Sequence, residues 1–374
     1  MKITILIILG IALYACTNSK SPQSERIEIL DFGLIDKNAT NETKALYSNL
    51  KKISKTSILY GHQDDMAYGV GWWNIEGRSD VKEVCGSYPA VFGWELGNLG
   101  EERSLDSVLF TDIQKCIVKA HKLGAVNTIS WHMDNPINLK DSWNCTNAVY
   151  SIIPGGEKHN YFKNLLKTFA NFNDKLVDEN GTAIPIVFRP FHEHNGSWFW
   201  WGKKNCTKVE YKALWQFTVD YLRDSLNTHN LIYTYSPDGQ FNDYMERYPG
   251  NDYVDLMGVD YYFRGKIDKK HIDHFTNTLI EVTKLAKSNN KCAILSETGY
   301  ESIPDSLWFT KAILNPIKNN SNKIEMAYML CWRNANTKHH YAPYPGHPSA
   351  KDFMVFYSDS LTLFADDIKD LYKK

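Results

Sequence analysis

Apolar residues along this chain occur in two alternating patterns: short, nearly continuous runs, and longer stretches in which they recur every three or four positions. The first pattern is typical of strands buried on both faces, and the second of amphipathic helices. Eight strand candidates follow one another at residues 57–63, 89–96, 125–132, 184–193, 231–238, 253–262, 291–300 and 325–333. Helical patterns lie near residues 105–123, 158–178, 208–228, 268–289, 304–318 and 350–372, and the stretches after the first and fifth strands show no clear pattern.

The order of these elements predicts the fold. Eight apolar strands separated by helices indicate a parallel sheet, and eight such units are the number that closes a barrel. The rival architecture is an open, doubly wound sheet, but no glycine-rich phosphate loop follows the first strand. We therefore predict an α/β fold with a single (β/α)8 TIM barrel across residues 41–374 and an active site at the C-terminal strand ends.

Each predicted strand begins with apolar residues and ends with residues capable of chemistry. A strand that only fills the core has no reason to end in His, Glu or Arg, because an unpaired buried charge is costly. The 11 Trp and 22 Tyr of the chain are either core residues or, in part, the walls of a cleft that stacks sugar rings. We expect a polar, aromatic-lined bowl at the strand ends. These ends are Gly61-His62-Gln63, Trp94-Glu95, Trp131-His132, His192-Glu193, Ser236-Pro237-Asp238, Asp260-Tyr261-Tyr262, Ser296-Glu297 and Trp332-Arg333.

The N-terminus has the pattern of an export signal. Lys2 is followed by an apolar run, residues 3–13, that is too short to span a bilayer. The sequence Leu13-Tyr14-Ala15-Cys16 resembles a bacterial lipoprotein signal, which implies a signal peptide at 1–15, lipidation of Cys16 and a tether at 16–40. A plain signal peptide is the alternative, because Tyr14 is not the commonest residue before Ala15. No acidic run follows Cys16, which by resemblance to other lipoproteins favours a periplasm-facing membrane anchor over the cell surface.

Charge and cysteine content exclude several partners. The 42 basic and 43 acidic residues give a net charge of -1, so nothing points to nucleic acid or to an anionic membrane surface. Apart from Cys16, the cysteines are widely spaced without a CxxC pair, which argues against a zinc site. Two of them lie in apolar runs and are predicted to be buried, and the disulfide connectivity stays open. The six are Cys85, Cys116, Cys145, Cys206, Cys292 and Cys331.

Two other chemistries are less well supported by the strand ends. Metal-assisted hydrolysis would need converging ligands, and four histidines invite that interpretation: His62, His132, His192 and His194. The neighbouring Trp and Tyr residues suit sugar stacking better than a hydrated metal, so we expect no metal and no cofactor. A serine nucleophile is not supported, because the chain lacks a GxSxG elbow.

Two carboxylates on different strands fit glycoside hydrolysis. Glu193 ends the fourth predicted strand and Glu297 the seventh, so in a closed ring of eight they face each other across the mouth. Cleavage of a glycosidic bond needs a proton donor at the leaving oxygen and a carboxylate at the anomeric carbon. A separation of about 5–5.5 Å would make the enzyme retaining and one of about 6.5–9.5 Å inverting. The sequence leaves this separation open.

Longer motifs around both glutamates identify a family. Residues 188–202, FRPFHEHNGSWFWWG, closely resemble the acid/base signature of glycoside hydrolase family 26, whose members are mostly β-mannanases. Residues 296–299, SETG, look like its nucleophile segment. Shorter blocks at 61–63, 131–132, 258–262 and 332–333 match as well, so that the resemblance covers about residues 40–365.

The resemblance implies roles for individual residues. Glu193 would be the acid/base and Glu297 the nucleophile of a retaining enzyme. The implied sugar contacts are His132 and His192 at the reacting sugar, the aromatic platforms Trp198 and Trp332, and Arg333 at the next mannose toward the non-reducing end. Tyr262 would orient the nucleophile. For His192, Tyr262 and the two tryptophans, Trp198 and Trp332, a role in packing alone is the alternative, and the sequence leaves it open.

Strand periodicity adds two supporting residues and raises one difficulty. Arg189 lies on the same strand face as Glu193 and can hold Glu297 as an anion, although a structural ion pair is the alternative. Asp260 shares a face with Tyr262 and would support the same network. His192 points away from Glu193 in a regular strand, so a bulge or the strand's end is needed to bring both to the mouth. Trp200 and Trp201 are predicted to be packing residues, and Glu95 and Asp238 only to line the cleft.

The resemblance implies hydrolysis of β-1,4-mannosidic bonds in mannan, galactomannan or glucomannan by a monomer. Both endo action and exo release of mannobiose are compatible with the sequence. A periplasmic location slightly favours exo action, for which the segments 133–160 or 334–350 would have to close one end of the cleft. Within the family the alternatives are a β-1,3-xylanase and a mixed-linkage β-glucanase. Outside it the alternative is a non-catalytic glycan-binding lipoprotein, which would not need two opposed carboxylates.

Overall fold

The computed structural model describes residues 33–369 and 371–373. The predicted signal peptide, Cys16 and most of the tether lie outside the described residues. Within the described part of the chain, no helix has both the length and the apolar character needed to cross a membrane. The six cysteines in this part are all free thiols, and four of them are buried, including Cys292 and Cys331 as predicted.

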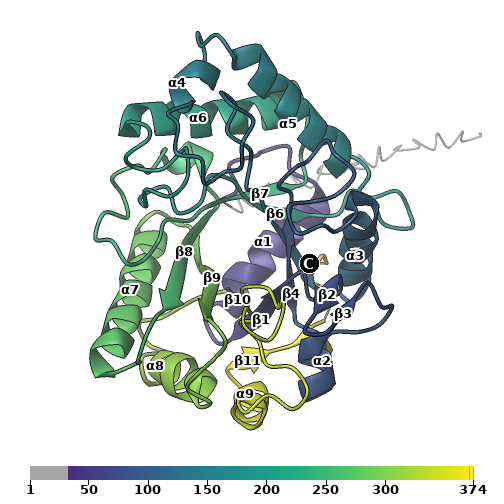
Figure 1. The fold of residues 1–374 in the computed structure, drawn as a ribbon, viewed down its shortest axis with the longest axis vertical. Coiled ribbons are helices and arrows are strands. Elements are labelled where there is room, and N and C mark those ends of the chain that lie inside the picture. Colours follow the sequence, from purple (N-terminus) through teal and green to yellow (C-terminus); the bar gives the residue numbers. More distant parts are fainter. Residues whose placement is uncertain (1–32, 370, 374) are drawn as a thin grey trace, which may run out of the picture. The chain divides into compact units, whose positions relative to one another are not determined.

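Eight parallel strands form a closed barrel (Figure 1). Neighbours along the chain pair in order, and the last strand pairs with the first from Leu59↔Tyr328 to His62↔Cys331. This closing pair confirms the predicted barrel and excludes an open sheet. The strands are β1 (Ile58–Gln63), β4 (Val91–Glu95), β5 (Val126–Ser130), β6 (Ile186–Arg189), β7 (Leu231–Tyr235), β8 (Leu256–Phe263), β9 (Cys292–Tyr300) and β10 (Tyr328–Cys331).

Helices between the strands cover the outside of the barrel. Two of the predicted helix starts are fixed by capping boxes: Thr207 with Glu210 before α6, and Asp268 with His271 before α7. The α-helices are α1 (Asn41–Ile53), α2 (Asp80–Cys85), α3 (Phe110–Lys122), α4 (Val149–Ile152), α5 (His159–Asn173), α6 (Lys208–Asp220), α7 (Lys269–Ser288), α8 (Asn315–Asn319) and α9 (Ala350–Tyr357). Shorter helical turns are η1 (Tyr221–Ser225), η2 (Asn251–Tyr253), η3 (Phe309–Leu314) and η4 (Ala365–Asp367).

The predicted closing helix at 350–372 is wrong beyond Tyr357. The chain turns after α9 and forms β11 (Thr362–Leu363), which pairs with the start of β1. Phe364 then stacks on Tyr60 with ring centroids 4.9 Å apart and is fully buried. Burial of this ring and the strand pairing stabilise the turn more than continued helix would. A hairpin of β2 (Tyr68–Gly69) and β3 (Trp72–Trp73) is also absent from the prediction.

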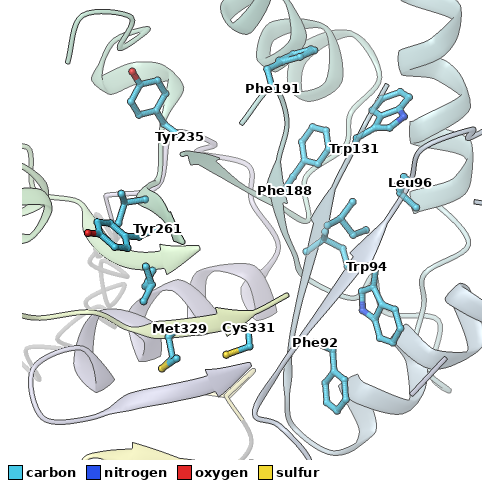
Figure 2. Close-up of a cluster of buried hydrophobic side chains, with 14 of the residues drawn as sticks. Phe92, Trp94, Leu96, Trp131, Phe188, Phe191, Tyr235, Tyr261, Met329 and Cys331 are labelled. Atoms are coloured by element: carbon cyan, nitrogen blue, oxygen red, sulfur yellow. The ribbon is translucent and has the colours of Figure 1, made fainter. Parts of the chain in front are cut away.

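Strand side chains alternate between the barrel interior and the helices. Outward-facing residues such as Phe92, Trp94 and Phe188 pack into the layer between the strands and the helices (Figure 2). Inward-facing Val, Ile and Leu residues form a second cluster together with Leu46 and Leu50 of α1, the helix that lies across the barrel in Figure 1. The apolar filling therefore occupies the half of the barrel nearest the strand starts. Polar residues follow it toward the strand ends.

Candidate active site

A bulge in β9 turns Glu297 into the barrel. Val259 of β8 lies opposite Leu295, but Asp260 lies opposite Glu297, so Ser296 is an extra residue in β9. The pairing of β9 with β10 is irregular at the same place. In a regular strand, Ser296 would face the interior and Glu297 the helices. The bulge lets both residues face inward, as bulges beside active sites commonly do.

Two donors hold the Glu297 carboxylate. Arg189 donates from Nη2 to Oε2 of Glu297, and the Tyr262 hydroxyl donates to Oε1 at 2.5 Å. Burial, followed by the Glu297 charge, raises the pKa of Tyr262, so this hydroxyl keeps its proton and remains a donor. Glu297 is only 5% exposed. The two donors fix the orientation of the Glu297 carboxyl group.

Arg189 links Glu297 to a second buried carboxyl group. Its Nη1 donates to Oδ2 of Asp260 at 2.7 Å. Although burial alone would lower the pKa of Arg189, Asp260 and Glu297 raise it above its usual value. Burial and the charge of Glu297 raise the pKa of Asp260 to about 7 against the opposing effect of Arg189. One guanidinium thus serves two carboxyl groups, and Ser236 and Ser296 donate to Asp260 at 2.7 and 2.8 Å.

Glu193 lies in a loop, not in a strand. Strand β6 spans Ile186–Arg189, so the predicted fourth strand, 184–193, began two residues too early and ended four residues too late. Phe191 and Glu193 both adopt positive φ, 48° and 50°, which strands do not contain. Their left-handed backbone brings both His192 and Glu193 to the barrel mouth, which regular alternation would have prevented. The Glu193 backbone N–H bonds to the Ser236 carbonyl at 2.8 Å, which fixes the loop on β7's end.

The surroundings of Glu193 favour its protonated form. Burial, and then the charges of Asp260, Glu297 and Asp238, raise its pKa well above the usual range. The indole N–H of Trp198 donates to Oε2 of Glu193 at 2.7 Å and opposes this shift only in part. A carboxyl group that stays protonated near neutral pH is suited to donate a proton to a leaving group.

A histidine pair lies beside the two glutamates. His132 bonds through Nδ1 to Oε2 of Glu95 at 2.7 Å, and its Nε2 lies 3.2 Å from Nε2 of His192. Burial opposes the charged form of His132, but Glu95 raises its pKa above the usual value. Burial, followed by Arg189 and His132, lowers the pKa of His192 far below its usual value. These opposite shifts favour the proton on His132 over His192, with His132 placed to donate to Glu95 and to the His192 ring.

Glu95 has a different place from the one predicted. It is 1% exposed and does not line the cleft. Its Oε1 accepts the backbone N–H groups of Gly97 and His132 at 2.6 and 2.8 Å, and its Oε2 accepts from Ser130 at 2.9 Å. Glu95 is thus a positioning residue for His132. The strand-end position of Glu95 correctly indicated that it lies near the pocket. It did not indicate that Glu95 is buried and bonded to His132.

Both glutamates line one pocket of about 580 Å³. Trp143, which the sequence did not single out, stacks on His132 with centroids 5.1 Å apart and is 47% exposed. Trp200 and Trp201 are fully buried packing residues, as predicted. The other residues of the lining include five candidates from the sequence and several loop residues: His132, His192, Trp198, Tyr262, Trp332, Phe199, Phe263, Arg264, Glu301 and Tyr341.

Arg333 lies beside this pocket rather than in its lining. Its Nη1 contacts Oδ1 of Asp106 at 3.1 Å, and Asp106 is on the loop after β4. Tyr68 of the β2–β3 hairpin donates to Asp64 at 3.0 Å and also interacts with Arg333. Asp64 and Asp106 lie on loops outside the predicted strand ends, and no pattern in the sequence indicated them.

The four strand-end histidines do not converge. His62 bonds to Asp65 at 2.7 Å, while the His194 ring packs 4.3 Å from that of Tyr211. Only His132 and His192 meet. Across residues 33–369 and 371–373, no group of three or more His, Cys, Asp or Glu side chains has an arrangement able to hold a metal ion.

Comparisons with known proteins agree on one family. Residues 35–347 match the model of glycosyl hydrolase family 26. The chain is 33% identical, over 88% of its length, to a mannan endo-1,4-β-mannosidase of Bifidobacterium adolescentis, but spans only 35% of that longer protein. It is 26% identical to a Bacillus subtilis mannan endo-1,4-β-mannosidase, over 67% of this chain and 68% of the relative. The solved structure of a β-mannanase from Bacteroides ovatus superimposes with a TM-score of 0.86 at 42% identity, covering 90% of this chain and 98% of that one.

Proposed function

This chain belongs to glycosyl hydrolase family 26, and we propose that it hydrolyses β-1,4-mannosidic bonds in mannan, galactomannan, glucomannan or manno-oligosaccharides with retention of configuration. The observation that carries the proposal is the pair of opposed glutamates in one pocket. Glu193 is in surroundings that keep it protonated, and Glu297 receives hydrogen bonds from Arg189 and Tyr262. The names of the relatives supply the substrate class.

In the proposed first step, Glu297 attacks the anomeric carbon while Glu193 gives its proton to the glycosidic oxygen. The bond from the anomeric carbon to that oxygen breaks, the leaving sugar departs with a new hydroxyl group, and an ester joins the other sugar to Glu297. In the second step water attacks the same carbon, Glu193 accepts a proton from the water, and Glu297 is released as a carboxylate.

Other residues of the pocket position the reacting sugar. We propose that His132 and His192 contact its hydroxyl groups and that Trp198 and Trp332 provide stacking faces. Arg333, held by Asp106 at 3.1 Å, would contact the next mannose toward the non-reducing end. Arg189 and Asp260 act through Glu297 and do not need to touch the substrate.

A panel of polysaccharides tests the substrate. We expect release of reducing sugar from mannan, galactomannan and glucomannan, and little from β-1,3-xylan or mixed-linkage β-glucan. Binding of mannan without turnover by the intact protein would support a glycan-binding lipoprotein instead. Chromatography of the earliest products from long mannan distinguishes a ladder of sizes, expected for endo action and favoured by the relatives' names, from mannobiose alone.

We further propose that the chain is exported and anchored through lipidated Cys16, facing the periplasm. The support is the pattern of residues 1–16 alone. Metabolic labelling with a radioactive fatty acid should mark the wild-type protein but not a Cys16→Ser variant. External protease should leave the protein of intact cells uncut, and cleavage would place it on the cell surface.

A further inference from the structure

The first described residues lie on the face of the barrel opposite the catalytic mouth. A Cβ on Gly33 would be 3.6 Å from the carbonyl oxygen of Asn290, which shortly precedes β9. The Ile35 backbone N–H bonds to Oδ1 of Asp255, directly before β8, at 2.8 Å. This part of the chain therefore contacts the starts of two strands, whereas the two glutamates line a pocket at the strand ends.

Lysines gather on this face, although the net charge of the whole chain is only -1. Lys51, near the end of α1, bonds through Nζ to Oδ1 of Asn290 at 3.1 Å. Burial lowers the pKa of Lys291, and the nearby charges of Lys37 and Lys51 lower it further. Two more lysines follow Lys51 at and just after the end of α1, and both are exposed. We call the five together the lysine face: Lys37, Lys51, Lys52, Lys55 and Lys291.

The acidic groups beside these lysines are mostly bonded within the protein. Asp255 is buried, and its two oxygens accept backbone N–H groups at 2.8 and 2.9 Å. Asp36 is buried and bonded to a histidine at 2.8 Å, and Glu325 is paired with Lys287 at 2.6 Å. Asp252 is exposed. The lysine face thus keeps an excess of positive charge toward the solvent.

The proposed lipid anchor would hold this face near a membrane. Gly33 follows Cys16 by 17 residues, which span at most about 60 Å when fully extended. Anionic phospholipids attract lysines that come within a Debye length, about 8–10 Å at moderate salt. A covalent tether of limited length raises the effective concentration of the lysine face at the surface, so several weak attractions are sufficient.

We propose that the lysine face lies against the anionic phospholipids of the membrane that holds the lipid anchor. The catalytic mouth, at the opposite ends of the strands, then faces away from the membrane and is open to polysaccharide chains. The inference rests on the proposed export and lipid anchor, and it does not depend on which polysaccharide is cleaved.

Co-sedimentation with vesicles tests the charge attraction separately from the lipid. The protein used would be residues 17–374, which contain the complete barrel and lack Cys16. We expect binding to vesicles with about 40% phosphatidylglycerol at low salt, and loss of this binding at about 0.5 M salt. Binding to pure phosphatidylcholine vesicles should be at least about tenfold weaker. Equal binding to the two kinds of vesicle, or none to either, would overturn the proposal.

Two double variants with the same change of charge show which face binds. Lys52→Gln/Lys55→Gln should weaken binding to the anionic vesicles about 25-fold, because each lysine near such a surface contributes about fivefold. Lys204→Gln/Lys338→Gln is the matched control, since both residues are exposed on loops after β6 and β10 at the catalytic mouth. It should bind within about twofold of the unaltered protein. Equal weakening in the two variants would contradict the assignment of the face.

The activity of the lipidated protein tests the direction of the mouth. In vesicles with phosphatidylglycerol, kcat/KM on long mannan should stay within about twofold of its value in detergent, because the mouth is open to the solution. A loss of about tenfold or more would place the mouth toward the membrane and overturn the proposal. Absence of activity in detergent as well would instead overturn the proposed function. Absence of the fatty-acid label from the wild-type protein would overturn the anchor, and this inference with it.

Discussion

The two glutamates share one pocket but differ in everything that surrounds them. Glu297 lies in a strand, at a bulge, where a guanidinium and a phenol donate to its two oxygens. Glu193 lies in a loop with left-handed backbone, where it receives a neutral indole N–H and faces three carboxyl groups. Two side chains of the same type are thus placed in surroundings that suit different roles. Glu297 has a cation and a hydroxyl group as hydrogen-bond donors, whereas burial among negative charges favours the protonated form of Glu193.

Removing the anionic partner should have the largest effect. We expect Glu297→Ala to lower kcat on mannan by roughly 10⁵-fold or more, because the covalent step loses its nucleophile. Glu83→Ala is a suitable control, since Glu83 is a surface residue paired with Arg78 at 2.7 Å and should leave kcat nearly unchanged. A Glu297→Ala enzyme with most of its activity would contradict the proposed roles.

Removing the acid should have a smaller effect that depends on the leaving group. We expect Glu193→Ala to lower kcat/KM on mannan by about 10²- to 10⁴-fold, the usual contribution of general acid–base catalysis. The loss should be much smaller with β-mannobiosyl fluoride when the first step is measured, because fluoride leaves without a proton. Equal losses with both substrates would show that Glu193 is not the proton donor.

Removing the hydrogen bond from Tyr262 to Glu297 should lower kcat/KM by less than the loss of either glutamate. Tyr262→Phe removes a hydrogen bond to a charged group, worth about 1.5–3 kcal/mol, so kcat/KM should fall about 10- to 150-fold. Tyr300→Phe is the matched control: its hydroxyl bonds to the Gly265 carbonyl at 2.6 Å, outside the pocket, and its loss should change kcat/KM little. The orienting role of Tyr262 would be refuted if the two variants behaved alike.

Removing the charge of Asp238 near Glu193 should have the smallest effect, a shift of the kcat/KM pH profile in a predictable direction. Burial raises the pKa of Asp238 to about 6, so Asp238 is an anion at neutral pH, where it raises the pKa of Glu193. Asp238→Asn removes that charge, and the pKa of Glu193 falls. The descending alkaline limb of the kcat/KM profile should therefore move to lower pH by less than about one unit. A move to higher pH would contradict this electrostatic account.

The sequence predicted the barrel because its signal repeats eight times. Each strand is a short apolar run between helical stretches, and the observed strands lie within the predicted ranges or extend them by one residue. The match to family 26 across residues 35–347 confirms the resemblance. The error at the C-terminus has a local cause: a helical pattern continues past Tyr357, but burial of Phe364 against Tyr60 changes the path of the chain.

The sequence suggested candidate residues for the site but not the backbone conformation that holds them. Strand-end positions and motifs made Glu193 and Glu297 the candidates, and both line one pocket, but strict alternation would have turned Glu297 toward the helices. The extra residue Ser296 and the left-handed residues Phe191 and Glu193 break that alternation, and such departures concentrate at functional sites. A bulge or a left-handed residue produces no periodic pattern of apolar residues, so the sequence does not reveal it.

Residues that act through tertiary contacts were missed for a related reason. Asp106 meets Arg333 across more than two hundred residues of chain, and Trp143 reaches His132 from an irregular loop. Neither position has a periodic pattern or belongs to a strand end. Only the folded arrangement shows that these side chains adjoin the site.

Trapping the covalent intermediate tests most directly that Glu297 is the nucleophile and Glu193 the acid. The wild-type enzyme would be incubated with 2-deoxy-2-fluoro-β-mannobiosyl fluoride, and the labelled peptide identified by mass spectrometry after proteolysis. We predict a stoichiometric adduct on Glu297 in the peptide that contains Ser296 and Thr298. An adduct on Glu193, or a catalytically active enzyme that forms no adduct and releases product of inverted configuration, would contradict the assignment.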